Sequence, residues 1–416
     1  MLAPDTHSYA RIRVVGVGGG GGNAIRRMVD AGIVGVEFLA INTDAQALDR
    51  TNADHKLQVG QSLTKGLGAG GDPQVGKAAA EESKQEIMMA LDGSDMVFLT
   101  CGLGGGTGTG ASPVVADIAR SLGALTIAII TRPFTIEGPR RKRNSDEGYE
   151  KLRACVDAII VIPNDNLLAV IEKKTSVSDA FRTADDVLRQ GVQGISEVIV
   201  VPGLINLDFA DVRAILSNAG PALMGIGLGS GDNRAQEAAR MAVSSPLLEQ
   251  TIDGAEGLLF NVTGPPDLSL AEVQEAAEII TASTQRADPD VLMGAVVDEA
   301  MGDTIRVTVV ATGFGEPVQR TRPTPAELGT FRPPPLRTTT LGQRPGQTPA
   351  DTAIEAQRQG SRASGFGPMP GQTTIGTPRR TVPPEPASAE PAVGQPRPIS
   401  RPQDDDLDIP AFLRRG

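Results

Sequence analysis

The stretch GGGTGTG (104–110) lies between an apolar segment, MVFLT (96–100), and a helical pattern over 112–121. In a glycine-rich turn between a strand and a helix, backbone amides can approach a phosphate without interference from Cβ atoms, and the helix N-terminus adds positive potential. The hydroxyls of Thr107 and Thr109 are donors that glycine lacks. The stretch therefore predicts a phosphate-binding loop inside a strand–helix unit.

A second glycine loop, GVGGGGGN (16–23), follows the strand pattern RIRVVGV (11–17) and precedes a helical pattern over 23–31. Two such loops on neighbouring strands indicate a di- or triphosphate spread across two helix N-termini. The second loop also contains GxGxxG, and Asp44 after the next strand has the place of the ribose-binding acid of a dehydrogenase. A dinucleotide-dependent oxidoreductase is therefore one alternative, and a merely tight turn is another.

The segment GDPQVGKA (71–78) matches a P-loop pattern except at its end. Ala78 replaces the Ser or Thr hydroxyl that would bind magnesium, and no strand leads into the segment. We interpret it as a structural loop, with Lys77 as a solvated helix residue.

Strand and helix patterns alternate outward from the two loops, which predicts a Rossmann-like parallel sheet covered on both faces. The predicted strands are 11–17, 36–42, 96–100, 124–131 and 157–162, and the predicted helices include 74–91 and 112–121. Apolar residues at spacings of three and four then run unbroken over 177–199, which predicts a long helix buried between two bodies.

A second, smaller α/β unit is predicted after this helix. Its helices are expected near 234–243 and over 269–283, and its strands over 257–263, 291–297 and 304–311. The last two strands are expected to form an antiparallel pair around Gly302 and Asp303.

Composition separates the last hundred residues from the rest. Of 31 prolines, 19 lie in 317–416, which also holds 13 Arg, no Lys and 9 acidic residues. Residues 1–316 therefore carry 26 basic residues (39 minus 13) against 41 acidic ones (50 minus 9). A body this acidic is a poor candidate for nucleic-acid binding, and the proline-rich end is typical of a flexible linker.

Scarce residue types exclude further classes of site. Two histidines, His7 and His55, offer little for a metal centre or a catalytic triad, and Cys101 with Cys155 cannot form a disulfide framework. No apolar run has the length of a membrane span, and the first residues lack a signal-peptide pattern. We expect a soluble, cytoplasmic protein.

GGGTGTG is the signature of the tubulin/FtsZ family of GTPases, and the sequence resembles the bacterial cell-division members of that family. Other matching stretches are spread along the chain. They are NTDAQAL (42–48), IPND (162–165), QGVQGISE (190–197), PGLINLDFADVR (202–213) and SSPLLE (244–249). The resemblance implies a tubulin-like fold and a GTPase that assembles into the cell-division ring. A tubulin-like scaffold that binds GTP without hydrolysing it is the remaining alternative.

The resemblance also implies a set of GTP- and GDP-binding residues. The phosphate contacts would be Gly19, Gly20, Gly21, Gly22, Asn23, Gly106, Thr107, Gly108 and Thr109, with Mg²⁺ bound mainly through the phosphates and no metal ligands from the protein. Glu137 would bind the ribose with Arg141 beside it, and Phe181 would stack on guanine. Asp185 would accept two hydrogen bonds from guanine, which adenine cannot donate. From the sequence alone, Phe181 could equally be core and Asp185 part of a solvated helix face.

Hydrolysis is assigned to the segment NLDFAD (206–211). An Asp can orient an attacking water, although a helix cap is the simpler interpretation of Asp208 or Asp211. The resemblance instead implies that Asn206, Asp208 and Asp211 act on the GTP of the next subunit in a head-to-tail filament. The length of the 177–199 helix agrees, because it separates Asp208 from Asp185.

The resemblance divides the chain into a flexible N-terminus (1–10), a GTP-binding domain (11–176), a central connecting helix (177–201), a C-terminal GTPase-activating domain (202–315), a disordered linker (316–403) and a partner-binding peptide (404–416). In the last segment, DDDLDIPAFLRRG, acidic residues precede apolar ones and arginines follow, as in an amphipathic docking peptide. It would bind membrane-tethering and regulatory division proteins at mid-cell, without membrane insertion.

Overall fold

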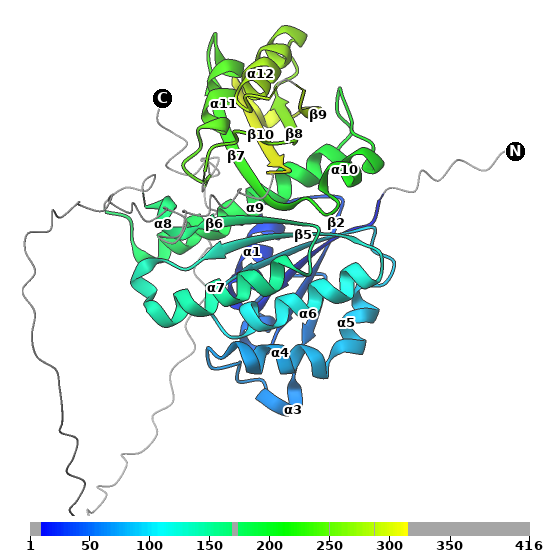
Figure 1. Cartoon of the computed structure of the whole chain (residues 1–416), viewed down its shortest axis with the longest axis vertical. Helices are drawn as coiled ribbons and strands as arrows, with labels where there is room; N and C mark the ends of the chain where they lie inside the picture. Colours follow the sequence, from blue (N-terminus) through cyan, green and yellow to red (C-terminus); the bar gives the residue numbers. More distant parts are fainter. Residues whose placement is uncertain (1–9, 169–173, 249, 287, 315–416) are drawn as a thin grey trace, which may run out of the picture. The chain divides into compact units, whose positions relative to one another are not determined.

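We describe a computed structural model of the chain, covering residues 10–168, 174–248, 250–286 and 288–314 (Figure 1). Ten strands form one sheet in the order β3-β2-β1-β4-β5-β6-β7-β10-β8-β9. The strands are β1 (Ile12–Val17), β2 (Val36–Asn42), β3 (His55–Gln58), β4 (Met96–Gly102), β5 (Leu125–Arg132), β6 (Ala158–Pro163), β7 (Gly220–Ser230), β8 (Gly257–Gly264), β9 (Asp290–Val297) and β10 (Thr304–Thr312).

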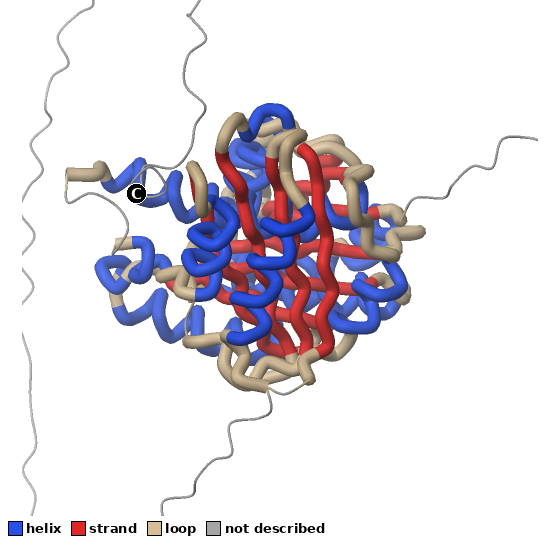
Figure 2. Tube along the Cα trace, turned by 90° about the horizontal axis from the view of Figure 1, so that it is seen from above, coloured by secondary structure: helices blue, strands red, loops and turns tan. Residues whose placement is uncertain are grey.

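The helices cover both faces of the sheet, as seen in Figure 2. The longer ones are α1 (Gly18–Asp30), α4 (Pro73–Glu82), α5 (Lys84–Leu91), α6 (Thr107–Ser121), α7 (Pro139–Arg153), α9 (Val177–Val200), α10 (Phe209–Leu216), α11 (Arg234–Val243) and α12 (Leu270–Ala282). The short ones are α2 (Ala45–Asp49), α3 (Gln61–Thr64), α8 (Asn164–Leu167), and the 3₁₀ turns η1 (Thr135–Glu137) and η2 (Glu299–Met301).

The first six strands are all parallel; β1, β2, β4, β5 and β6 were predicted and are largely buried, whereas the edge strand β3 was not predicted and is partly exposed. Along β4 the side chains alternate between two apolar clusters: Phe98 packs with α1 and α9, whereas Val97 and Leu99 pack with α4, α5 and α6. A strand buried on both sides reads as a continuous apolar run, which is why MVFLT was recognisable.

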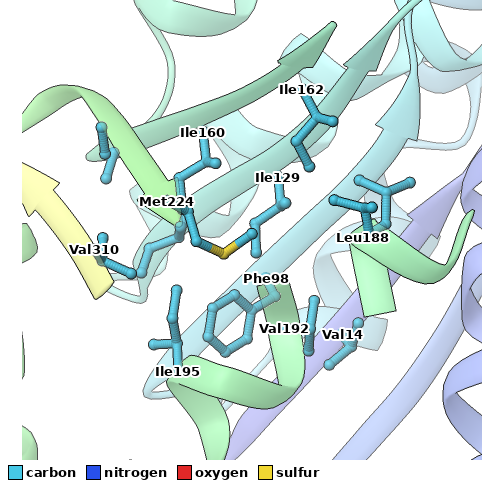
Figure 3. Close-up of a cluster of buried hydrophobic side chains, with 14 of the residues drawn as sticks. Val14, Phe98, Ile129, Ile160, Ile162, Leu188, Val192, Ile195, Met224 and Val310 are labelled. Atoms are coloured by element: carbon cyan, nitrogen blue, oxygen red, sulfur yellow. The ribbon is translucent and has the colours of Figure 1, made fainter. Parts of the chain in front are cut away.

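Helix α9 connects this N-terminal lobe (10–168) with the C-terminal lobe (202–314). Leu188, Val192 and Ile195 on α9 belong to the same buried cluster as Phe98 of β4 and Met224 of β7 (Figure 3). From Ala184 to Ile195 the predicted stripe of the long helix is therefore confirmed as core that is shared between the two lobes, whereas Val177 and Phe181 at its start are exposed.

The predicted antiparallel pair of 291–297 and 304–311 is wrong. Strand β10 lies between β7 and β8 and is antiparallel to both, whereas β9 is the edge strand and runs parallel to β8. The connection around Gly302 and Asp303 is not a tight hairpin turn, because it includes η2 and passes β8 to reach the far side of that strand.

Strand β7 and helix α7 were not predicted. Gly225, Gly227 and Gly229 interrupt the apolar pattern of β7, and a Cβ at any of them would lie 1.9–2.0 Å from a carbonyl oxygen of α11. These glycines let α11 pack directly on the strand. The predicted helix over 74–91 is two helices, α4 and α5, that meet at Ser83.

Two predicted segments, the linker (316–403) and the terminal peptide (404–416), lie outside the described residues, as does the N-terminal segment except Ala10. The predicted domain boundaries remain predictions. Among the described residues, no helix is both long and apolar enough to cross a membrane.

Candidate functional site

A cavity of about 350 Å³ lies where β1, β4, β5 and β6 end and α1, α6 and α9 begin. Ligands of open parallel sheets bind at this edge, where the strands end. The described residues that line it are Gly19, Gly20, Asn23, Gly102, Leu103, Gly105, Gly106, Thr107, Gly108, Thr131, Pro133, Glu137, Arg141, Asn164, Phe181, Ala184 and Asp185.

Two helix N-termini point at one end of this cavity. Helix α1 begins at Gly18 directly after β1, and α6 begins at Thr107 after Gly106. Neither has a side chain that caps its first amides, although α2 and α9 are capped by Asp44 and Ser176. Uncapped N-termini leave N–H groups and a partial positive charge available to an anion. This end of the cavity is suited to phosphate.

The glycines around this end serve two different purposes. A Cβ on Gly18 would lie 2.8 Å from the backbone nitrogen of Gly108, so the two loops touch through glycine. Gly18 also has a φ of 73°, which a side chain would strain. A Cβ on Gly19 or Gly105 would meet nothing within 4 Å. At these two positions the open space belongs to the cavity.

The two predicted threonines differ in position. Thr107 lines the cavity, and its hydroxyl is 2.6 Å from that of Thr43. Thr109 is not among the lining residues, and its hydroxyl accepts a hydrogen bond from the Gly104 amide at 2.8 Å. Thr109 therefore shapes the loop from inside.

The predicted phosphate contacts Gly21 and Gly22 also lie outside the lining. Gly21 lets α1 approach β4, since a Cβ there would be 2.4 Å from the Thr100 oxygen.

The next part of the cavity wall is formed by η1 and the start of α7. Glu137 accepts a hydrogen bond from the Phe134 amide at 2.9 Å and pairs with Arg141. Gly138 has a φ of 94°, and Pro139 occupies the first turn of α7, where a missing N–H costs nothing. Pro139 therefore starts the helix that carries Arg141 to the cavity.

Phe181 and Asp185 are one turn apart on α9 and both face the cavity. Phe181 is 39% exposed and meets Phe134 edge-on, with ring centroids 5.3 Å apart. It is therefore not a core residue. Its ring lies at the cavity, where a planar base can stack on it.

Asp185 is mostly buried, so it does not belong to a solvated helix face. Burial raises its pKa to about 6, although Arg27 lies 3.4 Å away and favours the charged form. The neighbouring Asp186 is bound by Arg189 and Gln190, each at 2.6 Å, and lies outside the cavity lining. Only one of the two adjacent carboxylates is thus available to a ligand.

Asn164, Thr131 and Pro133 line the cavity and were not predicted as site residues. Asn164 is 4% exposed, and its Oδ1 has no hydrogen-bond partner within the described part of the chain. A buried acceptor without a partner is costly, and a ligand donor in the cavity would satisfy it. The motif IPND, a polar pair directly after a strand, was the available signal.

The residues predicted for hydrolysis are elsewhere. Asp208 caps α10 through Oδ1, which accepts from the Ala210 amide at 3.1 Å, and Asp211 lies exposed in the first turn of α10. The Asn206 Oδ1 accepts from the Gly203 amide at 2.6 Å. Neither Asp208, Asp211 nor Asn206 lines the cavity.

Two competing interpretations of the sequence can now be assessed. Asp44 caps α2 by accepting from the Ala47 amide at 3.0 Å and is not among the described lining residues, so a dehydrogenase-type ribose contact has no support. Lys77 is exposed on α4 and pairs with Glu81 at 3.5 Å, as expected of a solvated helix residue.

Comparison with known proteins identifies two regions of the chain. A family model described as "Tubulin/FtsZ family, GTPase domain" matches residues 11–172, and one described as "FtsZ family, C-terminal domain" matches 220–315. A solved structure of an empty FtsZ dimer from M. jannaschii is 48% identical, with a TM-score of 0.71 over 74% of this chain and 89% of that one. A GTPγS-bound protofilament of CetZ2 from Haloferax volcanii is 21% identical, with a TM-score of 0.63 over 74% and 94%, and supports the fold alone.

Proposed function

The chain belongs to the tubulin/FtsZ family and is a GTPase, and from this we propose that it assembles head to tail into filaments that form the bacterial cell-division ring. The observation that carries the proposal is the division of the site. The residues that we assign to the phosphates, the ribose and the base line one cavity, while the carboxylates that we assign to hydrolysis follow the far end of α9 in the sequence and do not line that cavity.

In this proposal the triphosphate lies against the uncapped N-termini of α1 and α6, over the open positions at Gly19 and Gly105. Glu137 binds the ribose, and the base stacks on Phe181. Asp185 accepts from two guanine donors, and the Asn164 Oδ1 gains a partner. Adenine offers Asp185 no such pair of donors, so the cavity selects GTP.

Asp208 and Asp211 act on the GTP of a neighbouring subunit. From Asp185 to the end of α9 is roughly 22 Å of helix, and α10 follows that end in the sequence. The Asp208 cap uses only Oδ1, so its other carboxylate oxygen can still orient a water for attack on the γ-phosphate. Asn206 holds the loop that presents both carboxylates.

In this proposal Mg²⁺ binds together with the nucleotide and not through side chains of the protein. The only carboxylates among the described lining residues are Glu137 and Asp185, which we assign to the ribose and the base. Mg²⁺ would therefore be held mainly through the nucleotide phosphates, whose charge it would neutralise.

The remaining parts of the proposal concern place and partners. Residues 404–416 bind membrane-tethering and regulatory division proteins, which bring the filaments to mid-cell in the cytoplasm. The support is the order of charges and apolar residues in DDDLDIPAFLRRG.

The decisive experiment records phosphate release and light scattering together while the protein concentration is varied. A site completed by the next subunit gives turnover per subunit that rises steeply above a threshold, together with the scattering. Turnover per subunit that is independent of concentration would show that one chain holds the whole site.

A further inference from the structure

The turn η1 contributes residues to two cavities, the nucleotide cavity and a second one, each of about 350 Å³. Glu137, at the end of η1, lines the nucleotide cavity, whereas Thr135, at its beginning, lines the second cavity. Pro133, just before the turn, lines both. The turn therefore forms part of the wall between the two cavities, and whatever fixes Thr135 on one side also affects the place of Glu137 on the other.

The motif IPND (162–165) is divided between the same two cavities. Asn164 lines the nucleotide cavity, and Asp165 lines the second one. The strands that lead to η1 and to this motif, β5 and β6, are parallel neighbours (Figure 1). Because the ends of neighbouring parallel strands lie at the same edge of a sheet, the segments that follow them can meet. Thr135 and Asp165 do so, although they are 30 residues apart in the sequence.

Asp165 holds Thr135 with both of its carboxylate oxygens. Oδ1 accepts from the Thr135 backbone amide at 2.9 Å, and Oδ2 accepts from the Thr135 hydroxyl at 2.6 Å. Hydrogen bonds to an ionised acceptor are roughly twice as strong as bonds between neutral groups, and a pair of them also fixes orientation. Asp165 therefore fixes both the backbone and the side chain of the first residue in η1.

The amide before Thr135 is bound from the side of the nucleotide. The Phe134 amide donates to Oε1 of Glu137 at 2.9 Å, so two consecutive amides are held by two carboxylates, one from each cavity. Phe134 is buried and anchors the chain before the turn, but none of the three residues of η1 is buried. Asp165 supplies the anchor that packing does not give to η1.

We propose that Asp165 is a positioning residue for the ribose contact of Glu137. The inference rests on the proposed function, in which Glu137 binds the ribose. Without the two bonds from Asp165, Thr135 can rotate, and Glu137, two residues further on, leaves its place in the cavity wall for part of the time. The ribose contact is then weakened, whereas the phosphate end of the cavity is unchanged.

A role of Asp165 in the stability of α8 is the simpler alternative. Asp165 lies in the first turn of α8, where a carboxylate is favoured by the helix dipole. A change that acted through α8 would also disturb Asn164, which begins this helix and lines the nucleotide cavity. Such a change would weaken every guanine nucleotide, with or without ribose hydroxyls. The two roles therefore differ in what they do to a nucleotide that has no such hydroxyls.

Equilibrium binding of GDP and of 2′,3′-dideoxy-GDP to the full-length chain tests the proposal. The dideoxy nucleotide lacks both ribose hydroxyls but keeps the base and the phosphates, and neither diphosphate requires hydrolysis or filaments. The unmodified chain should bind GDP roughly tenfold more tightly than dideoxy-GDP. In Asp165→Ala the affinity for GDP should fall roughly five- to tenfold, whereas the affinity for dideoxy-GDP should stay the same.

Changes at Thr135 give the same test without touching α8. Thr135→Val keeps the shape and the amide but loses the hydroxyl, so GDP affinity alone should fall about threefold. Thr135→Ser keeps the hydroxyl and should bind both nucleotides like the unmodified chain. Thr251→Val is the matched control, because the Thr251 hydroxyl donates to Asp253 at 3.0 Å in the C-terminal lobe. This control should leave both affinities unchanged.

A double variant tests whether Asp165 acts through Glu137. Glu137→Ala removes the ribose contact, so adding Asp165→Ala to it should have no further effect on either nucleotide. A further loss would overturn the proposal.

Two other outcomes separate this inference from the proposed function. If the unmodified chain bound GDP and dideoxy-GDP equally well, the ribose contact of Glu137 and the role of Asp165 would both be wrong. If it preferred GDP and Asp165→Ala kept that preference, whether or not both affinities fell, only the role of Asp165 would be overturned.

Discussion

The residues near the two ends of α9 differ in how far they form a site within one chain. At the N-terminal end Asp185 is largely buried, Phe181 meets Phe134, and two helix N-termini converge on one cavity. Beyond the C-terminal end Asp208 and Asp211 are exposed and line no part of that cavity. The proposed function accounts for this difference, since in it binding belongs to one chain whereas hydrolysis needs two.

The largest expected effect is a loss of phosphate release when the charge of Asp208, beyond the C-terminal end of α9, is removed. Asp208→Asn keeps a good N-cap for α10, so the melting temperature should stay nearly unchanged. The amide cannot orient water as a carboxylate does, and phosphate release should fall by roughly a hundredfold or more. GTP affinity, measured by equilibrium binding, should be the same as in the unmodified chain.

Asp298→Asn is the matched control for this prediction. Asp298 caps η2 by accepting from the Ala300 amide at 2.9 Å, so the same chemical change is made at another cap in the same lobe. If Asp208→Asn turned over GTP at the rate of Asp298→Asn, the exposed end of α9 would have no part in hydrolysis.

The next largest effect is on GTP affinity and concerns Asp185, near the N-terminal end of α9. Asp185→Asn removes one of two acceptors for guanine, and GTP affinity should fall by about 1–3 kcal/mol, roughly five- to 150-fold. Discrimination against ATP should fall with it. Asp186→Asn is the control, because it changes the adjacent carboxylate on the same helix, which binds Arg189 and Gln190 instead. Equal losses in the two variants would mean that Asp185 acts only on the stability of α9.

The binding half of the site was far more accessible to sequence analysis than the arrangement of the C-terminal lobe. Phosphate loops are local: a strand, glycines and a helix follow one another, so GGGTGTG predicts its own geometry. The place of β10 between β7 and β8 depends on pairing across distant segments, and a short connection after β9 gave a misleading hairpin signal.

A glycine in the sequence can serve physically different purposes in the fold. Gly19 and Gly105 leave space for a ligand, whereas Gly225 leaves space for α11, and the sequence does not distinguish these uses. Asn164 was not predicted as a site residue although IPND was a signal, because the burial of its Oδ1 without a partner is visible only in the folded chain. Helix α7 was missed because its first turn is almost entirely polar and offers no apolar stripe.

A smaller effect follows from the pKa of Asp185. With a pKa of about 6 in the nucleotide-free chain, this carboxyl is mostly protonated at pH 5 and can no longer accept two hydrogen bonds. GTP affinity should fall about tenfold for each pH unit below 6, whereas Asp185→Asn should show no such dependence. Titration of binding between pH 5 and 8 checks both statements.

The raised pKa of Asp185 affects folding stability in the opposite direction from GTP binding as the pH changes. Since burial raises the folded-state pKa above that of the free side chain, 3.8, the contribution of Asp185 to folding is greatest at low pH and is lost as pH rises through 6. Weaker binding at pH 5 therefore cannot be assigned to unfolding caused by this group. Affinity that stayed constant from pH 5 to 8 would mean that Asp185 makes no paired contact with the base.

The smallest effect distinguishes a stacking surface from a merely apolar cover at the buried end. Phe181→Leu keeps an apolar side chain but removes the aromatic face, and GTP affinity should fall only a few-fold, since base stacking is worth about 1–3 kcal/mol against alanine. Phe181→Tyr keeps the face and should bind like the unmodified chain. If the Phe181→Leu and Phe181→Tyr variants bound GTP equally well, the Phe181 ring would serve only to exclude water. Because neither change reaches Asp208, turnover at saturating GTP should be unaffected in both variants, and a shared loss of turnover would mean that the two ends of α9 are coupled within one chain.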